Sequence, residues 1–224
     1  MNLKIITELN RLVKNNPKLL LDKNQFLQVI NGTFAIELDN IDNTDINYLE
    51  KIVDDAVLAG YFGKVWYPET KKYKYSGLAI IDEVNAMNPE SVIDIGCGYN
   101  EFKGKINNLI GIDPYNNKAD IKSSIEDYET DTQFDVAICL GSINFGGSQK
   151  IIQEMEKVIS LVKDGGYIYF RVNPGEQHSA PEARWINFYD WDPVFISNVA
   201  NALNCELVML RQDVGNRFYF VLRK

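Results

Sequence analysis

The sequence predicts an α/β fold in which helices cover a mostly parallel sheet whose last strand is antiparallel. Three observations lead to this prediction. From residue 91 onwards, short apolar runs that end in Gly or Asp alternate with amphipathic segments, as in parallel strands joined by helices. The connection between the last two strand-like runs is too short for a parallel crossover. Residues 1–70, in contrast, show helical periodicity without strand-helix alternation.

The N-terminal segment, residues 1–70, is predicted to form a helical unit, and residues 71–224 a second domain that contains the sheet. Thr44 can cap a helix over Asp45–Ala59, which Gly60 ends. A further helix is expected from Ser76 to Met87, because the Asn-Pro pair that follows disfavours its continuation.

Four apolar runs predict the parallel strands, and an amphipathic helix over Ser148–Val162 lies between the last two of them. The four runs are Ser91–Ile95, Leu109–Ile112, Phe134–Leu140 and Tyr167–Val172.

The C-terminal part predicts a helix over Pro193–Leu203 and two strands, Glu206–Arg211 and Arg217–Leu222. Only Gln212–Asn216 lie between these strands, whereas a parallel crossover needs about a dozen residues or more. The two strands are therefore expected to form an antiparallel hairpin, which is unlike a nicotinamide-binding Rossmann domain.

Composition narrows the class of protein further. Apolar residues make up 46% of the 224 residues and charged residues 24%, which is typical of a folded domain. The formal net charge of −8 disfavours a nucleic acid partner, because the protein's field repels a phosphate backbone, although a local basic patch stays possible. The same field favours a cationic ligand.

The cysteines and the apolar runs bear on the compartment. Cys97, Cys139 and Cys205 have neither the spacing of a zinc site nor that of a disulfide framework, so no metal is predicted and a reducing compartment is expected. The apolar run at the N-terminus is too short for a signal peptide, and no run is long enough to cross a membrane. A cytoplasmic protein without membrane association is the resulting expectation.

The motif that carries most chemical information is Asp94-Ile95-Gly96-Cys97-Gly98. It joins a predicted strand to a turn in which glycine lets the backbone bend and a ligand approach closely. Asp113 ends the next predicted strand, where a carboxylate can accept hydrogen bonds from both hydroxyls of a ribose. This arrangement indicates an adenosine-binding site, although a Gly-x-Gly turn alone is weakly specific.

The residues around this turn favour a ligand without phosphate. A dinucleotide fingerprint requires a third glycine where this chain has Glu101, whose carboxylate would lie beside the pyrophosphate. Asp94 adds a second negative charge at the same turn. A ligand with a positive centre therefore fits better than NAD, and a nicotinamide-dependent oxidoreductase is disfavoured.

In these motifs the sequence resembles the class I S-adenosylmethionine-dependent methyltransferases. The matching pieces, over residues 75–224, are the Asp94–Gly98 turn, Ile112-Asp113, Phe134–Ile138, Leu161–Gly166 and the terminal hairpin. The resemblance implies a Rossmann-like sheet of seven strands in the order 3-2-1-4-5-7-6, with strand 7 antiparallel and with helices on both faces. It also implies a third strand around Asp120–Lys122. The chain lacks the Asp/Asn-Pro-Pro-Tyr/Phe tetrapeptide of DNA amino-group methylases, which argues against that activity.

The resemblance implies S-adenosylmethionine as cofactor and assigns its contacts. Asp94, acting through water, and the two glycines would hold the methionine end, and Asp113 the ribose. Ser124 and Ile125 would flank the adenine, and Leu140 to Ser142 would lie under the sulfonium. Cys97 is better explained as a small turn residue than as a reactive thiol. The complete set of expected cofactor contacts is Tyr75, Asp94, Gly96, Cys97, Gly98, Asp113, Pro114, Ser124, Ile125, Leu140, Gly141 and Ser142.

Two residues are candidates on the acceptor side. His178, the only histidine, follows the fifth family strand, so it is a candidate general base or orienting donor; a solvated loop histidine is the competing interpretation. Asn144 can orient an acceptor amine, and capping of its own loop explains it equally well.

Two functions stay open at this point. The first is methyl transfer from S-adenosylmethionine to an acceptor, with residues 1–70 as a lid that excludes water. A small-molecule acceptor is favoured over nucleic acid, while protein and tRNA acceptors remain open. The second is a non-catalytic module with the same fold that binds S-adenosylmethionine or a partner. The sequence indicates neither the acceptor nor the oligomeric state.

Overall fold

The computed structural model describes residues 1–175 and 178–224 and consists of two compact units. One unit contains residues 1–66 and 178–187, and the other contains the remaining described residues, 67–175 and 188–224. The division near residue 66 lies close to the boundary expected after residue 70. Residues 178–187, in contrast, were expected in the second domain and belong to the N-terminal unit in the structure.

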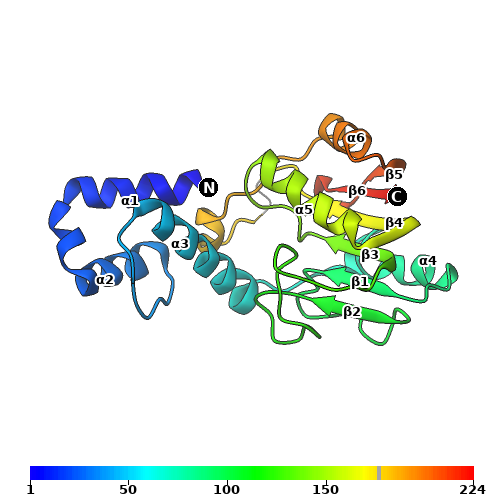
Figure 1. Ribbon diagram of the computed structural model, residues 1–224, viewed down its shortest axis with the longest axis horizontal. Coiled ribbons are helices and arrows are strands. Elements are labelled where there is room, and N and C mark those ends of the chain that lie inside the picture. The colour runs from blue at the N-terminus through cyan, green and yellow to red at the C-terminus, as the bar shows by residue number, and fades with distance from the viewer. Residues whose placement is uncertain (176–177) are drawn as a thin grey trace. The chain divides into compact units, whose positions relative to one another are not determined.

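The N-terminal unit is entirely helical in its described elements (Figure 1). Its elements are α1 (Leu3–Asn15), α2 (Lys23–Phe34), α3 (Ile46–Gly60), 3₁₀ helices at Pro17–Leu21 and Pro181–Trp185, and a π-helical turn at Tyr61–Val65. The side chain of Asp45, and not that of Thr44, caps α3 by accepting from the amides of Asn47 and Tyr48. Side chains at helical spacing form the buried core: Ile5, Leu9, Phe26, Ile30, Leu49 and Val53.

The second unit is built on one six-stranded sheet with the order β2-β1-β3-β4-β6-β5. Its strands are β1 (Val92–Ile95), β2 (Leu109–Ile112), β3 (Phe134–Leu140), β4 (Val162–Val172), β5 (Glu206–Gln212) and β6 (Phe218–Arg223). β1 to β4 pair in parallel, while β6 is antiparallel to both β4 and β5. The mostly parallel sheet and the terminal hairpin are therefore confirmed.

The strand order agrees with the expected order 3-2-1-4-5-7-6 except that its first strand is missing. Around Asp120–Lys122 the chain makes a single parallel bridge, between Ile112 and Ile121, instead of a strand. The segment carries one apolar side chain among polar neighbours, and Ile121 itself is 38% exposed. It buries too little apolar surface to extend the pairing, so six strands form in the described chain and a seventh is not confirmed.

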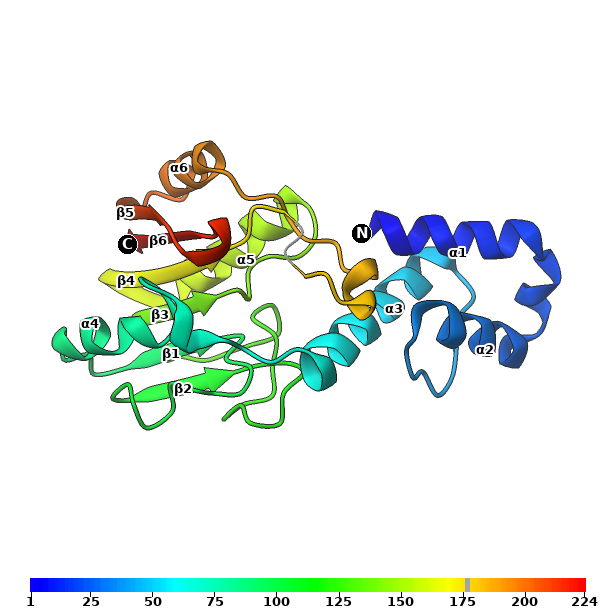
Figure 2. The ribbon, with the colours of Figure 1, turned by 180° about the vertical axis from the view of Figure 1, so that it is seen from behind.

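Helices cover both faces of the sheet (Figures 1 and 2). On one face α5 (Ser148–Ser160) and α6 (Pro193–Ala202) pack on the sheet, and on the other lies α4 (Ile81–Ala86), which a 3₁₀ turn, Gly77–Ile80, precedes. Two further 3₁₀ turns occur at Thr70–Lys72 and Val214–Asn216. Between β1 and β2 the chain forms a series of turns in place of a helix.

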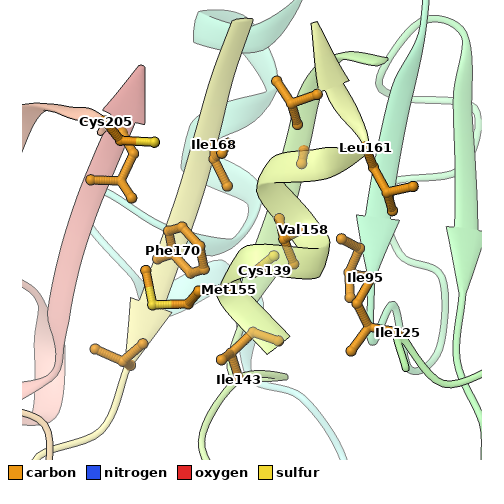
Figure 3. Packing of buried hydrophobic residues seen from close by; sticks show 14 of the residues in the cluster. Ile95, Ile125, Cys139, Ile143, Met155, Val158, Leu161, Ile168, Phe170 and Cys205 are labelled. Atoms are coloured by element: carbon orange, nitrogen blue, oxygen red, sulfur yellow. The ribbon is translucent and has the colours of Figure 1, made fainter. Parts of the chain in front are cut away.

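The larger core lies under α5 (Figure 3). Met155 and Val158 of this helix point at the sheet, where they meet residues such as Phe170 of β4, while Phe170 stacks on Phe220 at 4.7 Å between ring centroids. Alternate strand residues face the second core under α4, as Tyr169 does. Burial on both faces explains the continuous apolar runs in the sequence and leaves the carboxyl ends of the parallel strands as the place for polar side chains.

Candidate functional site

The turn after β1 and the end of β2 meet at the carboxyl edge of the sheet. Gly96 and Gly98 both have left-handed backbone angles, with φ of 68° and 53°, which glycine adopts without strain. The amide of Gly98 donates to Oδ2 of Asp113 at 2.9 Å. The structure thus brings together the glycine turn and the carboxylate that the sequence analysis paired.

Asp113 also orders the chain that follows it. Its Oδ1 accepts from the amides of Tyr115 at 2.8 Å and Asn116 at 2.7 Å, so Pro114 lies within a turn that this carboxylate closes. The residue is 8% exposed. A carboxylate offers about four acceptor sites, and three backbone amides occupy three of them. Asp113 therefore retains capacity for a hydroxyl while being held in a fixed orientation.

Asp94 is the second carboxyl group at this edge, and it is almost completely buried, at 3% exposed. None of the described residues gives it a hydrogen bond. Burial, together with the nearby charge of Asp113, raises the pKa of Asp94 to about 8. A buried carboxyl group in this condition is a favourable neighbour for a cationic ligand, since a positive charge would stabilise its ionised form.

The ends of β1 and β3 approach each other at Gly96 and Ser142. A Cβ on Gly96 would collide with the Cβ of Ser142, so only glycine fits beside that residue. One residue earlier, Gly141 has a φ of 98°, and the carbonyl of Leu140 accepts from Nη2 of Arg171 at 3.3 Å. The predicted sulfonium-side residues, Leu140 to Ser142, therefore lie directly beside the glycine turn.

Cys97 packs inside the turn. Its Sγ would be 2.8 Å from a Cβ built on Gly111, so sulfur and glycine fit against each other. Burial and the charges of Asp94 and Asp113 raise the pKa of the Cys97 thiol well above its ordinary value. The thiol stays protonated at neutral pH, which supports a small packed side chain over a reactive one.

The segment expected to flank an adenine is well ordered by its own contacts. Ser124 exchanges hydrogen bonds with Asp127, its Oγ lying 2.7 Å from Oδ2 and 3.1 Å from the amide nitrogen. Ile125 is 7% exposed and lies in the larger core near Ile95 and Ile143 (Figure 3). The structure places these residues beyond β2 as expected, and their contact with an adenine remains a prediction.

The segment before α4 places Tyr67 and Tyr75 in different surroundings. Tyr75 stacks on Tyr219 of β6 and lies under the guanidinium of Arg211, at centroid distances of 6.3 Å and 4.9 Å. Because β3 and β4 lie between β6 and β1, this position does not bring Tyr75 to the glycine turn. Instead the ring of Tyr67 packs against that of Tyr99 in the turn, at 4.7 Å.

Thr70 strengthens the same contact, since its hydroxyl hydrogen-bonds the carboxylate of Glu101 just after the turn. Tyr67 and Thr70 thus contact residues at the turn, in addition to those expected from the sequence. The signal available in the sequence was the aromatic pair Trp66-Tyr67 in the segment before α4.

Asn144 is fully buried and holds the strand ends together. Its Oδ1 accepts from the amide of Asn173 at 3.0 Å, and its backbone carbonyl accepts from the amide of Tyr189. Its Nδ2 has no partner among the described residues. These bonds tie the loop of Asn144 to residues 173 and 189 and do not cap that loop itself, and a role toward an acceptor stays a prediction.

His178 belongs to the N-terminal unit. Its Nδ1 lies 2.9 Å from the hydroxyl of Tyr61, and the rings of Tyr61, Phe62 and Trp66 surround the imidazole. This packing argues against a solvated loop histidine. Residues 176–177, which directly precede His178, lie outside the described residues. The role of His178 as a base stays a prediction.

The strand order, the reversed β6 and the Gly98–Asp113 contact at the carboxyl edge together define the fold of class I S-adenosylmethionine-dependent methyltransferases, and the predicted resemblance is confirmed at the level of the fold. The chain is similar to 1,6-didemethyltoxoflavin-N1-methyltransferase from Burkholderia thailandensis, crystallised with 1,6-didemethyltoxoflavin and S-adenosylhomocysteine. That match has 13% identity and a TM-score of 0.60, and it covers 84% of this chain and 94% of the other.

Two further solved structures share the fold. A complex described as DhpI-SAM-HEP matches with 12% identity and a TM-score of 0.53, covering 76% of this chain and 98% of that one. An S-adenosylmethionine-dependent methyltransferase from Clostridium acetobutylicum matches with 12% identity and a TM-score of 0.51, covering 79% and 98%.

The sequence by itself gives no comparable match: no protein-family model and no curated protein matches it. Among the described residues, no helix combines the length and apolar character that a membrane crossing requires.

Proposed function

We propose that this chain transfers a methyl group from S-adenosylmethionine to a small-molecule acceptor. The observation that carries the proposal is the pair of carboxyl groups, Asp94 and Asp113, at the glycine turn of a methyltransferase fold. The structures of similar fold support the cofactor assignment, since one was crystallised with S-adenosylhomocysteine and another is described as a SAM complex.

The residues at the turn fit this cofactor chemically. Asp113 retains acceptor capacity for ribose hydroxyls, and the buried Asp94 gains from a positive charge nearby. Glu101, which replaces the third glycine of a dinucleotide fingerprint, bonds the hydroxyl of Thr70 and keeps a negative charge where a pyrophosphate would have to bind. The set therefore favours an adenosyl ligand with a cationic centre over NAD.

When bound, S-adenosylmethionine supplies an activated methyl group on its sulfonium. The task of the protein is then to position the acceptor in line with the methyl-sulfur bond and to exclude water. In this proposal Asp113 holds the ribose, and Gly96 and Gly98 let the backbone approach the methionine end. Leu140 to Ser142 face the reacting centre, and Tyr67 covers the turn through Tyr99.

The finer parts of the proposal concern the acceptor side. We infer that the helical unit formed by residues 1–66 and 178–187 acts as a lid, and that the segment around Asp120–Lys122 occupies the place of the third family strand. His178, oriented by the hydroxyl of Tyr61, is the candidate base for an acceptor that must lose a proton. The three free cysteines agree with a reducing compartment, on which the cytoplasmic expectation rests.

The decisive experiment is calorimetric titration with S-adenosylmethionine, S-adenosylhomocysteine and NAD. Binding of the first two and none of NAD is expected. Asp113→Asn should weaken S-adenosylhomocysteine binding by about 1–3 kcal/mol, because one acceptor oxygen becomes a donor. Asp135→Asn is the matched control: this carboxylate also accepts two backbone amides, from Glu90 and Ser91, but at the start of β3, the opposite end of the strand.

Equal affinities of the two variants would contradict the ribose contact, and binding of NAD would overturn the cofactor assignment. Turnover is tested separately by following S-adenosylhomocysteine formation in the presence of pooled small-molecule acceptors. A protein that binds the cofactor and never yields this product with any class of acceptor is instead the non-catalytic module.

A further inference from the structure

A buried guanidinium at the carboxyl edge has one donor, Nε, without a hydrogen-bond partner among the described residues. Arg171, near the end of β4, is only 7% exposed. Its Nη2 donates to the carbonyl of Leu140, whereas its Nε is buried without any hydrogen-bond partner among the described residues. Tyr73 covers the group, with the guanidinium carbon 4.4 Å from the ring centroid. An unpaired donor on a buried cation is costly, so this site favours an additional acceptor.

A second unpartnered donor points to the same place. Gly141 lies between the two side chains: a Cβ built there would be 3.1 Å from Nη2 of Arg171 and 3.8 Å from Nδ2 of Asn144. Nδ2 of Asn144, a fully buried residue, also lacks a partner in the described part of the chain. A guanidinium nitrogen of Arg171 and the unpartnered Nδ2 of Asn144 therefore both lie close to Gly141, the residue that follows β3, beside the glycine turn.

The neighbouring charges do not neutralise Arg171. Arg217 lies near the same tyrosine, with its guanidinium carbon 5.8 Å from the ring centroid of Tyr73. Its Nε donates to Oδ1 of Asn173 at 3.0 Å. Neither arginine forms an ion pair with a described carboxylate within 4.0 Å, in a protein whose net charge is −8.

Asp213 is a carboxylate that acts electrostatically on Arg171, and its oxygens already accept other hydrogen bonds. Its two oxygens accept from the amides of Lys74, Ser76 and Val214 and from the hydroxyl of Ser76. It fixes the segment before α4 and has no acceptor site left for the guanidinium. The arginine pair is therefore arranged for an anion that the chain itself does not provide.

We propose that Arg171, with Asn144 and Arg217, forms a subsite for a carboxylate group of the methyl acceptor, which makes the substrate a small carboxylic acid. This inference rests on the proposed function, because it needs the methyl donor at the glycine turn. Arg171 is on β4, and β3 separates β4 from β1, so the subsite lies two strands, or about 10 Å, from the strand that leads into the glycine turn. A planar guanidinium is well suited to the two oxygens of a carboxylate.

The direct readout is the Nε–Hε signal of Arg171 in the ¹⁵N-labelled full chain saturated with S-adenosylhomocysteine. The signal is assigned by its loss in Arg171→Lys. Titration with sodium acetate should move this signal downfield with saturation, whereas acetamide and sodium chloride should not. Arg211→Lys is the matched control, because Arg211 covers Tyr75 and not the subsite. In this variant acetate should shift the Arg171 signal as much as it does in the wild type.

Arg171→Lys can also be followed through the side-chain amide signal of Asn144, where half-saturation should need about tenfold more acetate. Arg217→Gln, which alters the less buried arginine, should raise the acetate requirement in the same direction. An Arg171 signal that ignores acetate, or that responds equally to chloride, overturns the subsite.

One comparison separates the acceptor from the cofactor as the source of the carboxylate. 5′-Methylthioadenosine lacks the amino-acid tail of S-adenosylhomocysteine. If the Arg171 signal moves when S-adenosylhomocysteine replaces 5′-methylthioadenosine, and acetate then has no effect, the group binds the cofactor tail and the acceptor assignment is wrong. Failure of the proposed function looks different: S-adenosylhomocysteine would not bind at all, while acetate would still shift Arg171 in the free protein.

Discussion

Asp94→Asn tests the electrostatics of the glycine turn. The carboxyl group of Asp94 is 3% exposed and lacks a hydrogen bond from the described residues, and its pKa is raised from 3.8 to about 8. Between these two pH values the folded state holds a proton that the unfolded chain has lost. The free energy of unfolding therefore falls as the pH rises through this window. Asparagine has nearly the same shape and does not ionise.

The size of the effect follows from the raised pKa. Each pH unit above 3.8 costs the wild type about 1.4 kcal/mol until the folded group ionises near pH 8. pH 7 lies about three units above 3.8, so at this pH Asp94→Asn should be more stable than the wild type by about 4 kcal/mol. In a chain of 224 residues this corresponds to a melting temperature about 10 °C higher. At pH 4 the two proteins should unfold at nearly the same temperature.

The assay is urea unfolding of both proteins at several pH values between 4 and 9, in the absence of ligand. The informative quantity is the difference between variant and wild type, which should grow with pH. Asp135→Asn is the control with the opposite sign: hydrogen bonds to Lys163, Ser91 and Glu90 lower the pKa of Asp135, so its replacement should destabilise the protein at neutral pH and matter less in acid. A pH-independent gain for Asp94→Asn would refute the reasoning, as would a loss.

Three further changes test other parts of the fold. Gly96→Ala should abolish S-adenosylhomocysteine binding in calorimetry and lower the melting temperature, because the new Cβ collides with Ser142. Gly104 is the matched control, since its φ of 74° is similar and the space around it is open. Gly104→Ala should therefore lower the stability only by the backbone strain of about 1–2 kcal/mol and leave binding intact. Glu154→Gln should stabilise the protein above pH 7 and not below pH 4.5, since burial raises the pKa of Glu154 to about 7, and equal urea midpoints at pH 8 would contradict this. Phe170→Ala should cost about 3–5 kcal/mol in urea unfolding, against under about 0.5 kcal/mol for the exposed Val208→Ala, and similar losses would count against the core as described.

Much of the sheet could be predicted because burial on both faces leaves a strong local signal. The four parallel strands appear as short apolar runs, and β2 and β3 begin and end where those runs do. The antiparallel hairpin followed from the short connection after Gln212, which is a geometric constraint rather than a statistical preference. The glycine turn and Asp113 were found because both residue types are demanded by their position at strand ends.

The errors have a different origin. The third family strand was expected from resemblance alone, and the polar segment around Ile121 lacks the apolar surface to form it. Tyr67 and Tyr75 both precede α4, and only tertiary packing decides which of them reaches the turn. Arg171 was overlooked inside an apolar run, although a charged residue within a buried strand is itself a signal.

The helical unit is assembled from two distant stretches of chain, and this limits how the protein can be cut. Asn2 bonds the carbonyl of Trp185, whose ring packs edge-on against Phe34 at 4.8 Å, and Ile186 beside it is completely buried. Residues 178–187 belong to the connection between β4 and α6. Deleting residues 1–66 would therefore expose the apolar side chains of this peptide to solvent and favour aggregation of the shortened protein. The helical unit cannot be removed by truncating the N-terminus alone. A protein that contains only the sheet unit requires that residues 178–187 also be replaced by a polar linker.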